Sequence, residues 1–89
     1  MQNWYITPDI KEVKVLENYK IYLMFETGEE KIFDMTELIN DSRMYEKLTD
    51  RDYFENVTIR KDTIEWANGE DVAPEYLYHN SVPINKYRN

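Results

Sequence analysis

The sequence predicts a small α+β domain in which two or three short helices pack on a mostly antiparallel sheet of about five strands. Three observations predict this fold. Apolar and polar residues alternate early in the chain and again near residue 60, glycine-containing turns follow these stretches, and the segment between them carries helix-capping patterns. Because 89 residues provide one core, residues 1–89 are expected to form a single domain.

Three strands are expected first. Residues 9–16 are rich in β-branched side chains, and residues 30–35 form a returning strand after the turn at Thr27 and Gly28. The strand between them, residues 19–26, shows the period of a half-buried strand. Its inward residues are Tyr19, Ile21, Leu23 and Phe25, and its outward residues are Lys20, Tyr22, Met24 and Glu26.

The register of the first hairpin stays open from sequence alone. A two-residue loop places Ile32 opposite Leu23, and a three-residue loop with a bulge places Phe33 there instead. In both cases Gly28 supplies the positive φ that such a turn needs.

The middle of the chain is expected to be helical, in pieces too short to be stable alone. The three segments are a helix through Ile39 that a capping-box pattern of Asp34 and Glu37 opens, a helix over residues 42–48 with Met44, Tyr45 and Leu48 on one face, and a single turn with Tyr53 and Phe54 that Thr49 or Asp50 caps.

Two further strands and a helix complete the predicted domain. Residues 57–60 and 63–66 alternate as strands around a turn at Lys61 and Asp62, and the Asn68–Gly69 dipeptide ends the second of them. Asp71 then leads into a short helix with Pro74 in its first turn. Residues 81–89 are expected to be frayed.

The residues from Ile64 to Tyr78 carry a resemblance to a known family. A tryptophan strand, an Asn–Gly turn and an Asp-led helix with proline follow one another there, and the match extends to Phe25 and Gly28 in the first hairpin. The chain resembles the domain-of-unknown-function family 2442 over about residues 8–78. Thr27 stands where members usually have an acidic residue.

The resemblance implies a compact α+β domain with no established activity, and it implies a partner-protein role, including antitoxin-like roles. Some members of the family continue into a helix-turn-helix domain. The present chain ends at Asn89, so the resemblance transfers no DNA-binding residues to it.

Composition narrows the function classes. With 18 acidic and 11 basic side chains the net charge is −7, which disfavours direct binding to nucleic acid and favours a basic protein partner, unless the charge serves solubility alone. Cysteine is absent, which excludes disulfides and thiolate sites. The start of the chain does not resemble a signal peptide, and no stretch is apolar enough to span a membrane. A cytoplasmic location is therefore expected.

Catalytic groups are sparse. Ser81 lies two residues from His79, the one histidine, without a rigid oxyanion site around them. Asp50, Asp52 and Glu55 have the spacing of a few oxygen ligands but lack the glycine of a calcium loop, and helix capping explains them equally well. The chain is therefore not expected to be an enzyme or to hold a cofactor or metal, and a small carboxylate enzyme with a metal is the least favoured alternative.

Two turns supply the candidate partner-binding residues. The first hairpin carries Glu26, Glu29 and Glu30, and the second turn carries Trp66, Asn68, Glu70, Asp71 and Glu75. In the structural interpretation Trp66 fills the core and Asp71 accepts backbone hydrogen bonds ahead of the helix. In the functional interpretation Trp66 is a partly exposed anchor, and the carboxylates, if gathered on one face, meet an arginine-rich partner.

The sequence therefore predicts a non-catalytic protein-binding module, either an antitoxin-like or a regulatory partner protein. The alternative is an acidic inhibitor of the phage anti-defence or anti-CRISPR type, which occupies the basic surface of a nucleic-acid-binding protein. The domain is expected to be a monomer or a weak homodimer that pairs through an exposed strand edge.

Overall fold

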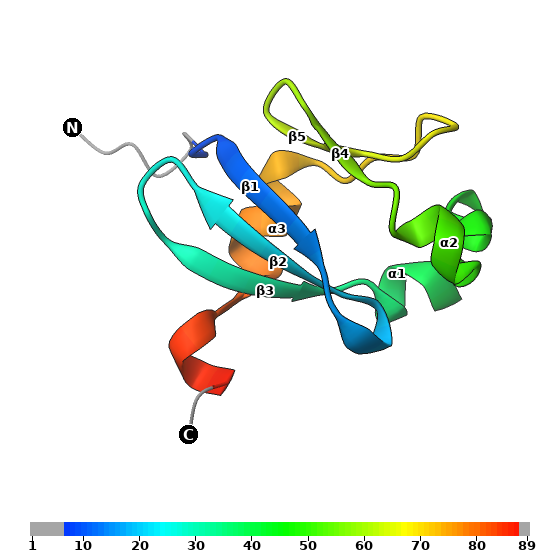
Figure 1. The fold of residues 1–89 in the computed structure, drawn as a ribbon, viewed down its shortest axis with the longest axis horizontal. Coiled ribbons are helices and arrows are strands. Elements are labelled where there is room, and N and C mark those ends of the chain that lie inside the picture. Colours follow the sequence, from blue (N-terminus) through cyan, green and yellow to red (C-terminus); the bar gives the residue numbers. More distant parts are fainter. Residues whose placement is uncertain (1–6, 88–89) are drawn as a thin grey trace.

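The structure is a computed structural model that describes residues 7–87, with the side chains described through Asn85. Strands come first, short helices follow in the middle, and a ribbon and a helix close the chain (Figure 1). The elements are β1 (Ile10–Val15), η1 (Glu17–Tyr19), β2 (Lys20–Phe25), β3 (Glu30–Asp34), α1 (Thr36–Asp41), η2 (Arg43–Thr49), α2 (Arg51–Phe54), β4 (Thr58–Arg60), β5 (Thr63–Glu65), α3 (Pro74–Asn80), β6 (Val82–Pro83) and η3 (Ile84–Tyr87).

The strands form two antiparallel sheets. The larger has the order β1-β2-β3-β6, and β4 pairs with β5 in a separate ribbon beside β1. Helix α3 covers one face of the larger sheet, while α1 and α2 gather beyond its end (Figure 1). The predicted α+β class and the mostly antiparallel sheet are confirmed.

Strand β2 lies in the middle of the three long strands and shows the predicted alternation. Ile21, Leu23 and Phe25 are fully buried on the face toward α3, whereas Tyr22 and Met24 are half-buried on the other face. A single core forms around this inner face, with buried residues from β1, β2, β3, η2, α2, β5 and α3. Its largest fully buried side chains include Phe25, Phe54, Leu48, Ile64 and Leu77.

The register of the first hairpin differs from both alternatives that the sequence left open. Leu23 lies opposite Lys31, because the loop begins one residue earlier than either alternative assumed. The backbone N–H of Gly28 donates to Phe25 O at 2.8 Å, and the N–H of Phe25 donates to Glu29 O at 2.9 Å. Gly28 has a φ of 92°, so the turn closes with a glycine bulge.

The turn after β5 repeats this hydrogen-bond pattern. Gly69 N–H donates to Trp66 O and Trp66 N–H donates to Glu70 O, both at 2.9 Å, and Gly69 has a φ of 93°. Glu65 and Asp71 consequently form an antiparallel bridge beyond the turn. The predicted Asn68–Gly69 turn is confirmed.

Of the two predicted caps at α1 and α2, the structure has one. Asp34 Oδ1 accepts from Thr36 N at 2.9 Å, but α1 has Met35 at its N-cap and no side-chain cap, so the capping box expected from Asp34 and Glu37 is wrong. Asp50 Oδ1 accepts from Asp52 N at 3.0 Å and caps α2. Asp50, not Thr49, is thus the cap of α2. The segment predicted as a helix over residues 42–48 is the 3₁₀ helix η2.

The expectation that Met44 shares a buried face with Tyr45 and Leu48 is wrong. Tyr45 and Leu48 are buried, but Met44 is 52% exposed. A 3₁₀ helix has three residues per turn, so positions 45 and 48 lie above one another and position 44 turns away from them.

The C-terminal region brings two further corrections. Helix α3 has Ala73 at its N-cap and no side-chain cap, so the expectation that Asp71 accepts hydrogen bonds from its backbone is wrong. The frayed tail expected at 81–89 is instead ordered through residue 87: Val82 pairs with Ile32, Pro83 pairs with Lys31, and η3 follows. Residues 88–89 lie outside the described part of the chain.

None of the helices described over residues 7–87 has the length and apolar character that crossing a membrane requires.

The central strand is the place to test the core. Leu23→Ala removes a fully buried side chain and leaves a cavity, so the free energy of unfolding should fall by about 2–5 kcal/mol. Met44→Ala, at an exposed position, should change it by no more than about 0.5 kcal/mol. Urea denaturation followed by circular dichroism measures both, and equal effects of the two substitutions would contradict the burial of Leu23 in the core.

Candidate functional site

Two of the three glutamates at the first hairpin, Glu29 and Glu30, accept hydrogen bonds from other side chains of the domain. The Glu29 carboxylate accepts from Thr27 Oγ1 at 2.7 Å and from the Tyr78 hydroxyl, 2.8 Å from Oε1 and 3.0 Å from Oε2. The hydrogen bonds from Thr27 and then Tyr78 lower the pKa of Glu29, because they stabilise its charged form. The same contact raises the pKa of the Tyr78 hydroxyl.

Tyr78, in α3, also contacts the first hairpin through its ring and its carbonyl group. Its ring meets Phe25 edge-on with centroids 5.1 Å apart, and Lys31 Nζ lies 4.0 Å from its centroid. Lys31 Nζ further donates to the carbonyl oxygen of Tyr78 at 2.7 Å. Glu29 therefore has a structural role in attaching this turn to the helix behind it.

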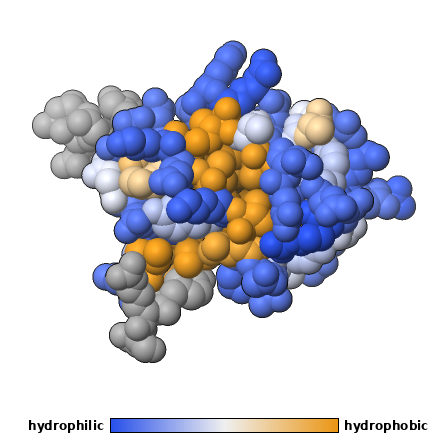
Figure 2. All heavy atoms as spheres, in the orientation of Figure 1, coloured by the Kyte–Doolittle hydropathy of each residue, from blue (hydrophilic) through white to orange (hydrophobic). Residues whose placement is uncertain are grey.

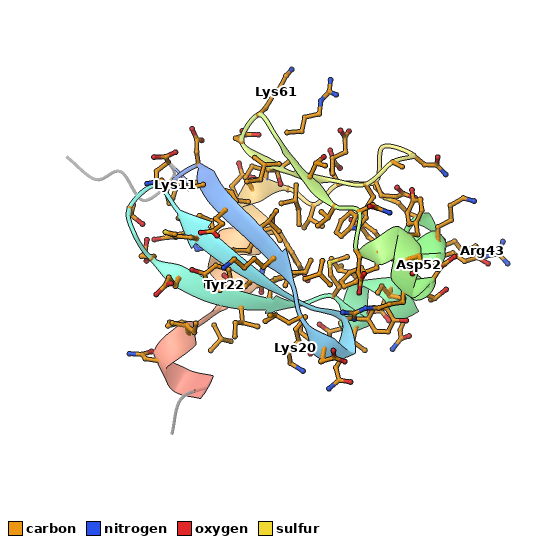
Figure 3. The ribbon with its side chains drawn as sticks, in the orientation of Figure 1. Lys11, Lys20, Tyr22, Arg43, Asp52 and Lys61 are labelled. Carbon is orange, nitrogen blue, oxygen red and sulfur yellow. The ribbon has the colours of Figure 1, made fainter. Side chains whose placement is uncertain are left out.

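Glu30 accepts a hydrogen bond on the face of the sheet that points away from α3, where Tyr22 lies (Figure 3). The Tyr22 hydroxyl donates to Glu30 Oε2 at 2.5 Å. This hydrogen bond is the main cause that raises the pKa of Tyr22 to about 12. The third carboxylate of this turn, Glu26, is exposed.

Trp66 and Glu70 are buried, which corrects the expectation that they are presented to a partner. Trp66 is 2% exposed, stacks on Phe54 with centroids 5.8 Å apart, and donates from Nε1 to Phe54 O at 2.9 Å. Glu70 is 7% exposed and accepts from the Tyr53 hydroxyl at 2.6 Å. Burial and then this contact raise the pKa of Tyr53. The structural interpretation of Trp66 is the correct one.

The other residues of the second turn are accessible but do not meet the first hairpin. Asn68, Asp71 and Glu75 are exposed. The β2–β3 turn lies at the left end of the 41 Å long axis and the turn after β5 lies at the right end (Figure 1). The turn with Asn68 is therefore remote from the first hairpin, whereas Glu75 lies in α3, one helical turn before the Tyr78 that contacts Glu29.

The catalytic candidates have structural contacts instead. Ser81 Oγ, in a residue 7% exposed, donates to Tyr78 O at 3.3 Å, while the neighbouring His79 is exposed. Glu55 pairs with Arg51 at 2.7 Å, and Asp50 caps α2. Within the described residues, no three His, Cys, Asp or Glu side chains are grouped so that they could hold a metal ion.

A groove of about 430 Å³ lies beside the C-terminal end of β3, between α1 and α3, and we call it the β3 groove. Apolar surface comes from Phe33, Leu38, Tyr76 and Val82, and polar surface from Asp34, Glu37, Asn40 and Asn80. The rings of Phe33 and Tyr76 meet edge-on with centroids 5.8 Å apart. Tyr76 and Val82 are 40% and 37% exposed, so much of their apolar surface faces solvent.

Sequence reasoning missed this groove. Tyr76 precedes the buried Leu77 in α3, so the apolar side chain of Tyr76 falls off the buried face of the helix. An aromatic residue outside the buried face of a predicted helix is the one sequence feature that indicates an exposed apolar surface here. Val82 gave no signal, because its segment was expected to be frayed and its pairing with Ile32 is a long-range contact.

The Tyr22–Glu30 contact yields a titration test. Since the pKa of Tyr22 is raised to about 12 in the folded state, its contribution to stability is complete below the ordinary value of 10.0 and is lost as pH rises from there toward 12. Glu30→Gln removes the negative charge and should shift the titration of Tyr22 to lower pH, measured by tyrosinate absorbance against Tyr22→Phe. Glu26→Gln, at the same turn, is the control and should leave the titration in place. An unchanged titration in Glu30→Gln contradicts the assignment of the raised pKa to the Glu30 carboxylate.

Apolar side chains also run across the face opposite α3, with hydrophilic groups on both sides (Figure 2).

Comparison with known proteins identifies the family of the chain. No curated protein and no solved structure matches the chain. The profile of the family described as "Protein of unknown function (DUF2442)" matches residues 10–83, from the first residue of β1 to the last residue of β6. The chain therefore belongs to the domain-of-unknown-function family 2442.

Proposed function

We propose that the chain is a non-catalytic protein-binding domain, an antitoxin-like or regulatory partner protein, and that its partner docks in the β3 groove. The observation that carries this proposal is the pairing of exposed apolar surface, on Tyr76 and Val82, with a polar border. Protein interfaces have this anatomy, in which an aromatic side chain at the centre supplies much of the affinity and polar residues surround it.

The acidic turns support the rival inhibitor role less well. Glu29 and Glu30 accept hydrogen bonds from Tyr78 and Tyr22, so their carboxylates already have partners. The turn after β5 lies at the other end of the long axis, so its carboxylates are remote from those of the first hairpin (Figure 1). The groove is therefore the better-supported docking place.

Affinity purification of the tagged chain from its source cells, at low and high salt and with mass spectrometry, tests the proposal. The wild-type chain should recover a partner protein. Tyr76→Ala should weaken recovery, with a loss of affinity of about 30-fold, the size expected when a central aromatic residue of an interface is truncated.

A matched pair of charge reversals locates the contact. Glu37 and Glu75 are both exposed and both occupy the first turn of a short helix, but only Glu37 lines the groove. Glu37→Lys should reduce recovery, and Glu75→Lys should not. If Glu26→Lys abolishes recovery while Glu37→Lys and Tyr76→Ala do not, the hairpin binds the partner and the groove does not. Recovery of no protein at either salt sinks the proposal of protein binding.

The antitoxin-like version has its own test. Co-expression of the chain should rescue cells from the toxicity of a small protein encoded beside it, and Tyr76→Ala should lose that rescue. Rescue that fails for every neighbouring gene leaves a regulatory partner role.

A further inference from the structure

The hydrogen-bond pattern of β3 determines which of its backbone groups face the groove. Met35 N–H donates to Tyr19 O, and Phe25 N–H donates to Glu29 O. Residues 29 and 35 therefore direct their backbone N–H and C=O groups toward β2. Backbone direction alternates along an antiparallel strand. Ile32 and Asp34 therefore direct their N–H and C=O groups toward the opposite edge.

Strand β6 covers only part of that edge. Val82 lies opposite Ile32, and the same register would place Asn80 opposite Asp34. Asn80, however, is the last residue of α3 and lines the groove. In the described part of the chain, the pairing with β6 ends at Ile32, and the strand edge at Asp34 opens into the β3 groove.

The charge of the groove selects among partners. Asp34 and Glu37 border it, and neither Lys nor Arg is found among the described residues that line it. Lys20 Nζ lies 3.8 Å from Asp34 Oδ2, in a solvent-screened surface ion pair that holds the Asp34 carboxylate only weakly. With a net charge of −7 on the whole chain, the groove attracts a positively charged segment.

We propose that the β3 groove takes an extended, basic segment of the partner, which pairs with the edge of β3 at Asp34 and places an apolar side chain against Tyr76 and Phe33. The inference rests on the function proposed above and names the chemistry of its partner. Strand addition uses main-chain hydrogen bonds for affinity and pockets for alternate side chains for specificity. A Lys or Arg on the segment meets Glu37 at the border of the groove.

A phage-displayed random dodecapeptide library, selected on the wild-type chain and counter-selected on Tyr76→Ala, tests the inference. Enriched peptides should alternate apolar residues with Lys or Arg. As synthetic peptides they should bind at least about tenfold more weakly to Glu37→Lys and equally well to Glu75→Lys. In a paired strand, every second backbone N–H points toward the neighbouring strand. N-methylation of the peptide amides that point toward β3 should therefore weaken binding, and N-methylation of the intervening amides should leave the affinity unchanged. Circular dichroism confirms that each variant is folded.

Other results separate the inference from the proposed function. Groove-dependent peptides that lack basic residues, bind as helices or tolerate N-methylation of both sets of amides overturn the extended basic segment, but they leave protein binding in the groove intact. No groove-dependent peptide at all also overturns the inference, and the affinity purification then decides the proposed function independently.

Discussion

The inner face of β2 is the surface on which the other elements depend. Ile21, Leu23 and Phe25 are fully buried there, and each such side chain contributes about 1.5–3 kcal/mol when it leaves water. The α-helices have only four to seven residues, too few to be stable alone, so they form because they close over this core. The packing of α3 on this face also brings Tyr76 beside Phe33 and so creates the β3 groove.

The two glycine turns lie at opposite ends of the domain, and each is attached to a helix by the same kind of hydrogen bond. In each, an aromatic residue opens the loop and a glutamate follows the glycine. Glu29 accepts a hydrogen bond from Tyr78, and Glu70 accepts one from Tyr53. Both tyrosines come from helices, Tyr78 from α3 and Tyr53 from α2, so each carboxylate attaches a turn to a helix. These charges are part of the fold, although in the sequence they look like solvated loop residues.

Local chemistry made part of this structure predictable. The alternation of β2, the Asn68–Gly69 turn and the cap at Asp50 each depend on residues close in sequence, and each is confirmed. Features set by distant contacts were missed or misread. The burial of Glu70 depends on Tyr53, the pairing of β6 depends on Ile32, and the β3 groove combines residues from two stretches of the chain, 32–40 and 76–82. The exposure of Met44 was misjudged because η2 has the period of a 3₁₀ helix.

Pro83 limits how far the sheet can grow. Val82 faces Ile32 across the ladder, so the alternation directs the backbone nitrogen of Pro83 away from β3, and that nitrogen carries no hydrogen. The outer side of β6 consequently lacks a donor that a further strand would need, a device that keeps sheet edges from stacking into fibres. The larger sheet therefore ends at β6 with an outer edge that resists the addition of a further strand and so resists open-ended growth.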